Sequence, residues 1–427
     1  MLISAILQNA QSVIDLVWVG RLGASAVASV ALGGTVVWAL FPLLMGVATG
    51  TVALVARAFG AGHPREASCV AGQSLMLAVV GGVLSAGLGT LLSGRLLDAF
   101  GAEPEVRAGG EQYLRVMLWG SFTVFLLFTG NAALQGAGDA RTPMQLMLLA
   151  NALNIVLDPV LIFGFGPIPR LGVAGAAWAT LLAQAAAALL ALRYLAQGRG
   201  PLQVRLSHWK PQPERIRRLL KIGLPGSGQM MVRSLMQVVL MRIAAGFGTT
   251  AVAAYGTGLR IHMMVLMPAF ALGGAAATMV GQNLGAGQAA RARKSAWLAT
   301  GLDALFMLGA SLLLMLLAPP IIRLFNRDPE VVAQGAAYLR IVSPSYLFAA
   351  LGIVLGRALN GAGDSLRPMI ITLFSLWGLQ VPLATTLTRV PDFGLNGLWW
   401  AIAVATAVNG LLTMAWFERG HWRHIRV

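Results

Sequence analysis

Long apolar segments constrain this chain more than any other feature of its sequence. A helix that crosses a bilayer needs roughly 20 apolar residues, and about twelve stretches of the chain meet this requirement. They lie at residues 1–20, 26–55, 68–95, 110–134, 142–166, 172–196, 222–247, 251–280, 292–318, 336–359, 367–388 and 394–416. Short alternating segments, which are typical of a membrane barrel, do not occur. The sequence therefore predicts an all-α integral membrane protein with twelve transmembrane helices.

The scarcity of charge supports this fold class. Only 11% of the residues are charged and 57% are hydrophobic, whereas soluble chains usually carry about 25% charged residues. This composition excludes a water-soluble enzyme, a disordered protein and a secreted disulfide scaffold. The single cysteine, Cys69, excludes an internal disulfide and a cysteine-based metal cluster. Five scattered histidines form no metal motif, so we expect no resident metal or cofactor.

Basic side chains indicate how the chain is oriented in the membrane. The chain has 31 Lys and Arg against 15 Asp and Glu. The basic residues of the even-numbered links and of the tail are Arg193, Arg199, Arg205, Lys210, Arg215, Arg217, Arg218, Lys221, Arg291, Arg293, Lys294, Arg419, Arg423 and Arg426. Because such residues stay on the cytoplasmic side, we expect a protein of the cytoplasmic (inner) membrane with both termini inside. A nucleic-acid partner is not expected, since its basic clusters would stand on a polar background.

The two halves of the chain repeat each other at an offset of 225 residues. Residues 23–28 match 248–253, 59–62 match 284–287, 113–116 match 338–341, and the Gly-Ala-Gly-Asp segment 136–139 matches 361–364. Halves in the same orientation place a substrate site at their interface and alternate its exposure by rocking. We expect the glycines of these segments to end helices in a left-handed conformation, and Asp139 and Asp364 to cap the next helices.

This repeat defines the predicted domains. They are an amino-terminal six-helix lobe (1–196), a basic cytoplasmic linker (197–221), a carboxyl-terminal six-helix lobe (222–416) and a cytoplasmic tail (417–427). The second lobe opens with a basic approach and Pro225, whose counterpart would fall just before Met1. We therefore expect the first helix to be truncated at its start, or the natural reading frame to begin upstream of Met1.

Acidic residues inside the spans are the first functional candidates. Twelve of the fifteen acids lie in links, helix ends or the tail, which leaves Asp15, Asp158 and Asp303 within spans. An ionisable group at membrane depth is costly and usually serves a function. Other polar residues recur one helical turn apart: Gln8 and Gln11 with Asp15, Asn151 and Asn154 with Asp158, Asn131 with Gln135, and Thr180 with Gln184. Pointed at each other, these stripes would line a wet, acidic pocket.

Two buried carboxyl groups suit ion-coupled transport. Burial and mutual repulsion favour the protonated form of one member, so the pair can load a proton on one side and release it on the other. The oxygens of Asp15, Asp158 and Asn154 could equally hold a hard cation such as Na+, and Pro159 would leave the carbonyl of Ile155 free beside them. Helix capping or bridging is the alternative for the two aspartates. Interhelical bonding is the alternative for Asn131, Asn154 and Thr180.

The carboxyl-terminal half carries a different set of polar residues. Asp303 shares this half with Arg233, Arg260, His262 and Arg357, so a structural ion pair is expected, with a second proton or substrate station as the alternative. The half also contains Met230, Met231, Met236, Met241, Met263, Met264 and Met267. Such methionines, among them the substrate candidates Met263 and Met267, either adapt to many ligands or fill gaps in a core.

Several segments resemble the multidrug and toxic compound extrusion (MATE) family. They are Ile-Asp-Leu-Val-Trp-Val-Gly-Arg-Leu-Gly at 14–23, the two Gly-Ala-Gly-Asp segments, Asn-Ile-Val-Leu-Asp-Pro at 154–159 and Gly-Val-Ala-Gly-Ala-Ala at 172–177. The resemblance implies twelve helices in two lobes and a V-shaped bundle. It also implies export of amphipathic, often cationic drugs against an inward flow of H+ or Na+. It also implies a monomer in the lipid bilayer and no enzymatic activity.

The resemblance also assigns coupling residues. In the DinF-like branch of the family they correspond to Asp15, Asp158, Asn154, Asn131 and, across a loop of variable length, Thr180. The NorM-like branch has an acid on span seven, where this chain has Arg233, and no acid stands near Arg357 on span ten. The DinF-like branch is therefore favoured, with coupling in the amino-terminal lobe.

Two other functions are alternatives to an H+-coupled or Na+-coupled antiporter. A lipid or lipid-linked sugar flippase would be expected to carry a cationic cavity, which Arg233, Arg260 and Arg357 could form. An intramembrane prenyl transferase would need clustered aspartates for Mg2+, and no D-x-x-x-D pair occurs in the sequence.

Overall fold

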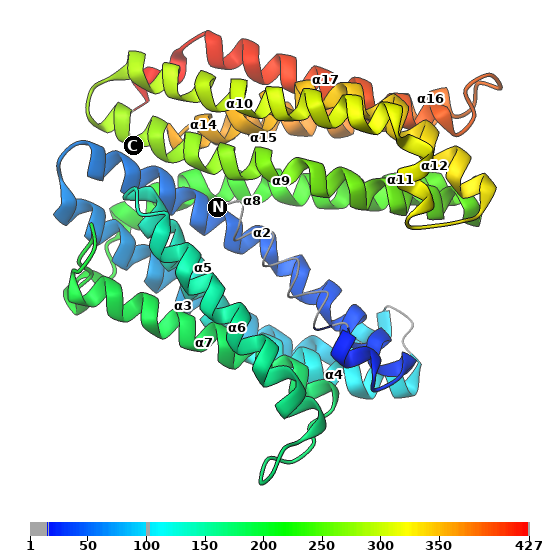
Figure 1. Cartoon of the computed structure of the whole chain (residues 1–427). Helices are drawn as coiled ribbons and strands as arrows, with labels where there is room; N and C mark the ends of the chain where they lie inside the picture. Colours follow the sequence, from blue (N-terminus) through cyan, green and yellow to red (C-terminus); the bar gives the residue numbers. More distant parts are fainter. Residues whose placement is uncertain (1–14, 16, 100–102, 426–427) are drawn as a thin grey trace. The chain divides into compact units, whose positions relative to one another are not determined.

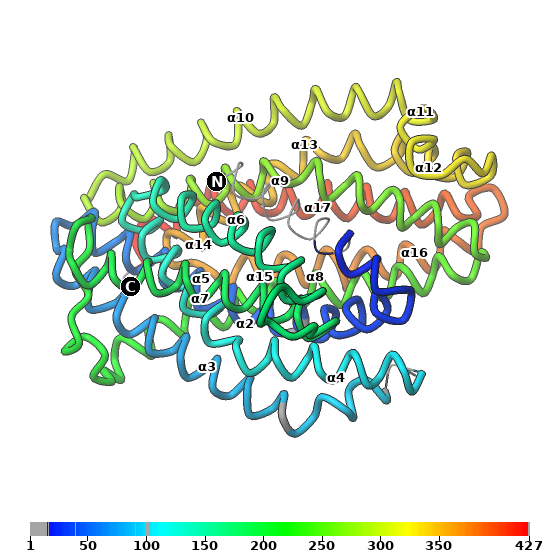
Figure 2. The backbone as a smooth tube through the Cα atoms, turned by 60° about the horizontal axis from the view of Figure 1, so that its bottom comes forward, coloured from blue at the N-terminus to red at the C-terminus, as the bar shows by residue number. Residues whose placement is uncertain are grey.

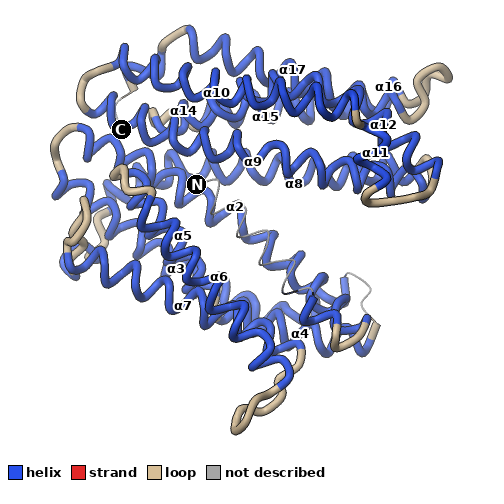
Figure 3. The backbone as a smooth tube through the Cα atoms, viewed as in Figure 1, coloured by secondary structure: helices blue, strands red, loops and turns tan. Residues whose placement is uncertain are grey.

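The described part of the chain is almost entirely helical (Figures 1 and 3). The computed structural model describes residues 15, 17–99 and 103–425. Among these residues nine helices are long and apolar enough to cross a membrane, or ten if the bent pair α4 and α5 counts as one span. The predicted first span falls mainly on residues outside the described part. The all-α class is confirmed, and the protein is a multi-pass membrane protein.

The chain divides into two compact units that meet in sequence between Leu224 and Pro225. The described helices of the first unit are α2 (Ala24–Gly60), α3 (Pro64–Ala99), α4 (Pro104–Trp119), α5 (Ser121–Gly136), α6 (Arg141–Phe163) and α7 (Val173–Gln197). Within this unit α2 and α3 pack against α4 and α5, and α6 runs along α7 (Figure 2). A short 3-10 helix, Leu206–Trp209, lies in the link that follows α7.

The second unit contains the rest of α8 (Pro213–Ala245), which begins in the first unit. Its further helices are α9 (Thr249–Gly285), α10 (Ala289–Leu316), α11 (Ala318–Arg323), α12 (Pro329–Val342), α13 (Tyr346–Ala350), α14 (Gly356–Gly361), α15 (Leu366–Leu373), α16 (Val381–Leu387) and α17 (Asn396–Glu418). π-Helical turns join α13 to α14 at Leu351–Leu355 and α15 to α16 at Phe374–Gln380. The helix α9 packs against α10, α12 and α14.

A bend divides the predicted fourth span. Its two parts, α4 and α5, meet at Gly120 at an angle of 46°. A Cβ atom at Gly120 would lie 1.5 Å from Cδ1 of Leu181 on α7. A side chain at position 120 would collide with Leu181 unless that leucine moved, so the glycine allows α7 to pack closely against the bend.

The internal repeat extends to the packing of single residues. A Cβ atom at Gly33 would lie 2.6 Å from Cδ1 of Tyr113, and a Cβ atom at Gly258 would lie 2.5 Å from Cδ1 of Tyr338. Both members of the second pair stand 225 positions after those of the first. Each unit thus seats a tyrosine ring against a glycine of a long helix, in the same place of the repeat.

The repeated Gly-Ala-Gly segments end helices as predicted. Gly138 has a φ of 93° and Gly363 a φ of 90°, a conformation that glycine adopts without strain. The predicted cap at Asp139 is also confirmed, because its Oδ1 accepts hydrogen bonds of 3.0 Å from the backbone N–H groups of Arg141 and Thr142. Asp139 therefore stabilises the first turn of α6.

The predicted cap at Asp364 is wrong. The helix that follows, α15, has no side-chain cap. The carboxylate instead pairs with Arg367 at 3.3 Å and accepts a 3.0 Å hydrogen bond from Nε1 of Trp416 on α17. The chain turns the same way at both places, but Trp416 offers Asp364 a tertiary partner. Its role is still structural, as expected.

Large apolar side chains on the outside of both units agree with a lipid environment. Trp38 on α2, Leu91 on α3 and Leu305 on α10 are 65%, 77% and 70% exposed. Such exposure would be costly in water over so many positions. In the second unit the core is aromatic: Tyr255 stacks on Trp399 at a centroid distance of 5.8 Å, and Tyr338 meets Trp399 edge-on at 5.0 Å.

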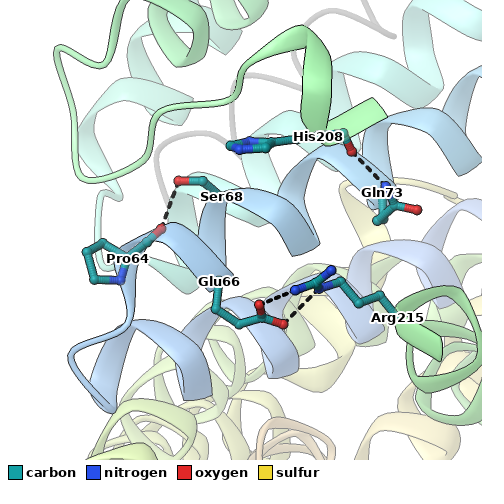
Figure 4. A network of polar contacts seen from close by, with 6 residues as sticks. All are labelled: Pro64, Glu66, Ser68, Gln73, His208 and Arg215. Atoms are coloured by element: carbon teal, nitrogen blue, oxygen red, sulfur yellow. Dashed lines mark hydrogen bonds and ion pairs between the residues drawn. The ribbon is translucent and has the colours of Figure 1, made fainter. Parts of the chain in front are cut away.

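The basic linker is tied to α3 by side chains of that helix (Figure 4). The fully buried Gln73 donates to the carbonyl oxygens of His208 and Lys210 at 2.6 and 2.7 Å, and its Oε1 accepts the N–H of Gln212 at 2.9 Å. Glu66 forms two hydrogen bonds with the guanidinium of Arg215, which raise the pKa of Arg215.

Replacement of Gln73 by Ala should release the linker. Three hydrogen bonds to the linker backbone would be lost. A buried polar group that is left without a hydrogen-bond partner costs about 1–3 kcal/mol of stability. We expect trypsin to cut the linker several times faster in detergent-solubilised Gln73→Ala protein than in the wild type. The control is Gln112→Ala, an exposed glutamine of α4. Equal cleavage of the two variants would show that Gln73 does not hold the linker.

Candidate functional site

The predicted coupling residues of the amino-terminal unit come from the first span and from the α6–α7 hairpin. Asp158 and Asn154 lie one turn apart on α6 and are both completely buried. Thr180 lies on the neighbouring helix α7 and is half-buried. Asp15, also half-buried, is helical and belongs to the first span. The close packing of α6 along α7 brings the polar stripes of these two helices together, as the sequence predicts.

Asn154 links the two helices of the hairpin. Its Nδ2 donates to Oδ1 of Asp158 and to Oγ1 of Thr180, each at 3.3 Å. The Thr180 hydroxyl in turn donates to the carbonyl oxygen of Ala176 at 3.1 Å. The amide therefore orients the carboxyl group of Asp158, while Thr180 holds the amide in place.

Asp15 and Asp158 interact directly. Their carboxyl groups are close enough to form a side-chain hydrogen bond. Two carboxyl groups can form such a bond only when one of them carries a proton, because two carboxylates are acceptors without a donor. A hydrogen bond between the two groups would therefore need one shared proton, which would join the first span to α6.

Several acceptor atoms at this site remain without a partner in the described part of the chain. They are Oδ1 of Asp15, Oδ1 of Asn154 and Oδ2 of Asp158, all shielded from solvent. Buried acceptors without donors are costly and rare in native proteins. No group of three or more His, Cys, Asp or Glu that could hold a metal ion occurs among the described residues. A cation here would therefore need amide, hydroxyl or backbone oxygens in addition to the two carboxyl groups.

An apolar cluster closes one side of the site. It consists of the buried residues Val19, Ala26, Ile162 and Ala176. Val19 and Ile162 stand one helical turn after Asp15 and Asp158, and Ala176 stands one turn before Thr180 on the antiparallel α7. The side chains of Trp18 and Phe163 add an edge-on contact with a centroid distance of 6.2 Å. The polar site is thus separated by one apolar layer from the end of the unit that carries the α6–α7 loop.

Tyr113 is a member of the site that the functional prediction missed. It lies on α4, and the charges of Asp15 and Asp158 act on it more weakly than its burial does. The ring rests against Gly33 of α2. The sequence contained one signal for this residue, since Tyr113 is matched by Tyr338 in the repeat, but the pairing alone did not connect it with the aspartates.

The remaining candidates of the amino-terminal unit are not placed in this network. Asn131 on α5 is 6% exposed and Gln184 on α7 is half-buried, and each has a buried side-chain oxygen without a partner among the described residues. Their part in coupling stays a prediction. Gln8 and Gln11 lie outside the described residues.

The ion pair predicted for Asp303 is wrong for the described part of the chain. Asp303 on α10 is completely buried, and both of its carboxyl oxygens are without a partner. No ion pair joins Asp303 to an arginine among the described residues. The alternative role as a second proton or substrate station stays a prediction.

The methionine candidates differ in exposure. Met263 on α9 is 37% exposed, whereas Met267, one turn further along the same helix, is half-buried and Met236 on α8 is part of the apolar core. The predicted methionine cluster is therefore divided between core filling and accessible surface.

Comparison with known proteins shows which family and which solved structures this chain resembles. The MatE family model matches residues 1–160 and 225–386. A probable multidrug resistance protein NorM from Thermotoga maritima is 30% identical over 98% of this chain and 90% of its own length. A protein from Shewanella oneidensis named FAD transporter is 28% identical over 94% of this chain and 88% of its own length. A crystal structure of MATE in the bent conformation superimposes with a TM-score of 0.92 at 27% identity and covers 98% of this chain and 93% of that one.

The stability of variants should separate the aspartates that hold the fold from those that do not. Asp139→Ala removes a helix cap and should lower the free energy of unfolding by about 1 kcal/mol. Asp158→Asn keeps a hydrogen-bonding side chain and removes an ionisable group from a buried site, so its unfolding midpoint should equal or exceed that of the wild type. Heating of detergent-purified protein, followed by tryptophan fluorescence, measures both midpoints. A larger loss for Asp158→Asn than for Asp139→Ala would assign Asp158 to structure.

Proposed function

The chain belongs to the MATE family of membrane transporters, and on that premise we propose that it exports amphipathic, often cationic compounds in exchange for H+ or Na+. The carboxyl pair of Asp15 and Asp158 is proposed as the coupling site. The observation that carries this proposal is the closeness of the carboxyl groups of Asp15 and Asp158, neither of which forms an ion pair with a basic side chain in the described part of the chain. The name of the Thermotoga maritima relative, a probable multidrug resistance protein, supports export of drugs.

The charge of the Asp15–Asp158 pair can account for the exchange of the coupling ion for the exported compound. With one proton the pair still carries one negative charge, and with none it carries two, which repel each other inside a medium of low polarity. A second proton, a sodium ion or a cationic compound can each neutralise that charge. Competition between the coupling ion and the compound for the same charge makes binding of one favour release of the other, which is the requirement for antiport.

Movement of the first span would connect protonation with access. The shared proton joins Asp15 to Asp158 on α6, and Val19 packs with Ile162 and Ala176 one turn away. Loss of the proton would drive the two carboxylates apart and loosen this apolar layer. Proton binding would restore it, so that the packing of the first span changes with the charge of the pair.

The proposed orientation places both termini and the basic linker in the cytoplasm. In this orientation the apolar cluster around Val19 lies toward the outer side of the membrane. A proton that arrives from outside must then pass this layer to reach the pair. Coupling in the amino-terminal unit agrees with the loss of acidic character in the other unit, where Leu240 stands at the repeat position of Asp15.

Transport by reconstituted vesicles tests the coupling assignment. The purified protein is placed in vesicles loaded with a fluorescent cation, and efflux is followed under an imposed pH gradient and, separately, under a Na+ gradient. Asp15→Asn and Asp158→Asn should each reduce gradient-driven efflux at least about fivefold. A factor of about five corresponds to the lower end of usual coupling free energies. Asp392→Asn, which changes an exposed loop aspartate, is the matched control.

The two gradients identify the ion. Efflux driven by the pH gradient alone supports H+ exchange, whereas a requirement for the Na+ gradient supports a sodium site at the same oxygens. Unchanged gradient-driven efflux in both Asp15→Asn and Asp158→Asn would defeat the assignment of this pair as the coupling site.

A further inference from the structure

A groove lies between α6 and α7 at the end of the first unit that carries the basic linker. Its volume is about 400 Å³, and the two helices that form it run side by side (Figure 1). Both helices contribute residues at the same spacing, positions 142, 145, 146 and 149 of α6 and positions 190, 193, 194 and 197 of α7. Residues three, four and seven apart share one side of a helix. The groove is therefore built from one continuous face of each helix.

The lining of this groove changes from charged to apolar along the helices. Arg193 in the last turns of α7 and Arg199 directly after that helix line the end at the linker. On α6, Leu149 lies seven residues after Thr142, which is roughly 10 Å further into the unit at 1.5 Å per residue. Leu149 and Leu190 line this deeper end and are 36% and 43% exposed, so the apolar end is open toward the outside of the unit.

The turn after α7 brings Arg199 to the groove. Gly198 ends the helix with a φ of 64°, and the chain reverses its direction there. A Cβ atom at Gly200 would lie 2.6 Å from Cε1 of Tyr194, so this glycine lets the link pass close to the ring. The hydroxyl of Tyr194 donates to Oδ2 of Asp139 at 3.3 Å, which fixes the ring. The backbone on both sides of Arg199 is thus held by packing and turn geometry.

The two arginines of the groove have no anionic partner in the described part of the chain. None of the ion pairs formed among the described residues includes Arg193 or Arg199. Asp139, the acid that contacts the lining, accepts hydrogen bonds from the hydroxyl groups of Thr142 and Tyr194 at 2.6 and 3.3 Å. It also caps α6. Both guanidinium groups are therefore available to an anion from outside the chain.

We propose that this groove binds a glycerophospholipid with an anionic headgroup. The phosphate would lie on Arg193 and Arg199, whose planar, forked donors match phosphate oxygens. One acyl chain would follow Leu149 and Leu190 into the bilayer. Basic pockets between transmembrane helices at a membrane surface recognise anionic headgroups in this way.

Two features favour a lipid over a role in orientation alone. An orientation signal requires basic charge in a link, whereas here the charges stand at one end of a cavity whose other end is apolar. The groove also continues into exposed apolar surface, because Leu148 and Leu189, next to its lining residues, are 40% and 67% exposed. The bound lipid is a resident ligand and not cargo. It would join the linker to the α6–α7 hairpin, and the inference does not depend on the proposed exchange.

Native mass spectrometry of the purified protein in a mild detergent tests this proposal. Phosphatidylglycerol and, separately, phosphatidylcholine are titrated into the sample. We expect the first phosphatidylglycerol to bind at least about tenfold more tightly than phosphatidylcholine, and the double variant Arg193→Gln/Arg199→Gln to lose this preference. The control is Arg217→Gln/Lys221→Gln, which removes two exposed charges of α8 beside the same linker and should keep the preference.

Two further variants separate a groove from a diffuse attraction of charges. Leu190→Trp keeps both arginines and fills the apolar end, so phosphatidylglycerol should bind at least about fivefold more weakly than to the wild type. Arg193→Lys/Arg199→Lys keeps the charge without the fork. An intermediate affinity is expected for it, and it replaces the glutamine double variant if that protein does not fold.

Three results would overturn the lipid site. They are a wild type without preference for phosphatidylglycerol, an equal loss in the Arg193→Gln/Arg199→Gln variant and its control, and undiminished binding in Leu190→Trp. The coupling proposal fails or stands separately, because Asp158→Asn should bind phosphatidylglycerol as the wild type even where gradient-driven efflux is lost.

Discussion

A hydrogen bond between Asp15 and Asp158, the proposed coupling pair, requires one proton shared by two carboxyl groups, because two carboxylates have no donor between them. In water, two carboxylates would each be solvated and would need no common proton. At membrane depth they lack that solvation, and burial of Asp158 with its Asn154 partner keeps water away. In the proposed coupling, the first span would therefore be attached to α6 through a bond that exists in one charge state and not in another. The contacts of Thr180 and Val19 acquire a functional meaning because they surround this bond.

The two units show how one backbone plan supports two kinds of chemistry. Both seat a tyrosine, Tyr113 or Tyr338, against a glycine of a long helix. Around Tyr113 the neighbours are carboxyl groups, whereas Tyr338 packs on the aromatic ring of Trp399. The packing that defines the repeat is conserved between the halves of this chain, while the charges that could bind a ligand are not.

Much of the fold and part of the site follow from the sequence. Helices and the association of Asn154, Asp158 and Thr180 were predictable because a polar side chain repeated every turn can be satisfied only by a neighbouring helix with the same pattern. The missing cap at Asp364 was not predictable, since the competing donor is a tryptophan distant in sequence. The close packing of Leu181 against Gly120 is likewise a tertiary contact. Such partners become visible only when helices are placed against each other.

The apolar layer formed by Val19, Ile162 and Ala176 affects more than the movement of compounds. If H+ is the coupling ion, as one form of the proposal has it, a proton that crossed this layer without exchange would dissipate the gradient that the cell maintains for many other processes. A defect in this layer would thus burden a cell that meets no drug at all. Growth in the absence of toxic compounds, rather than resistance to them, is then the condition under which natural selection acts on these three aliphatic side chains.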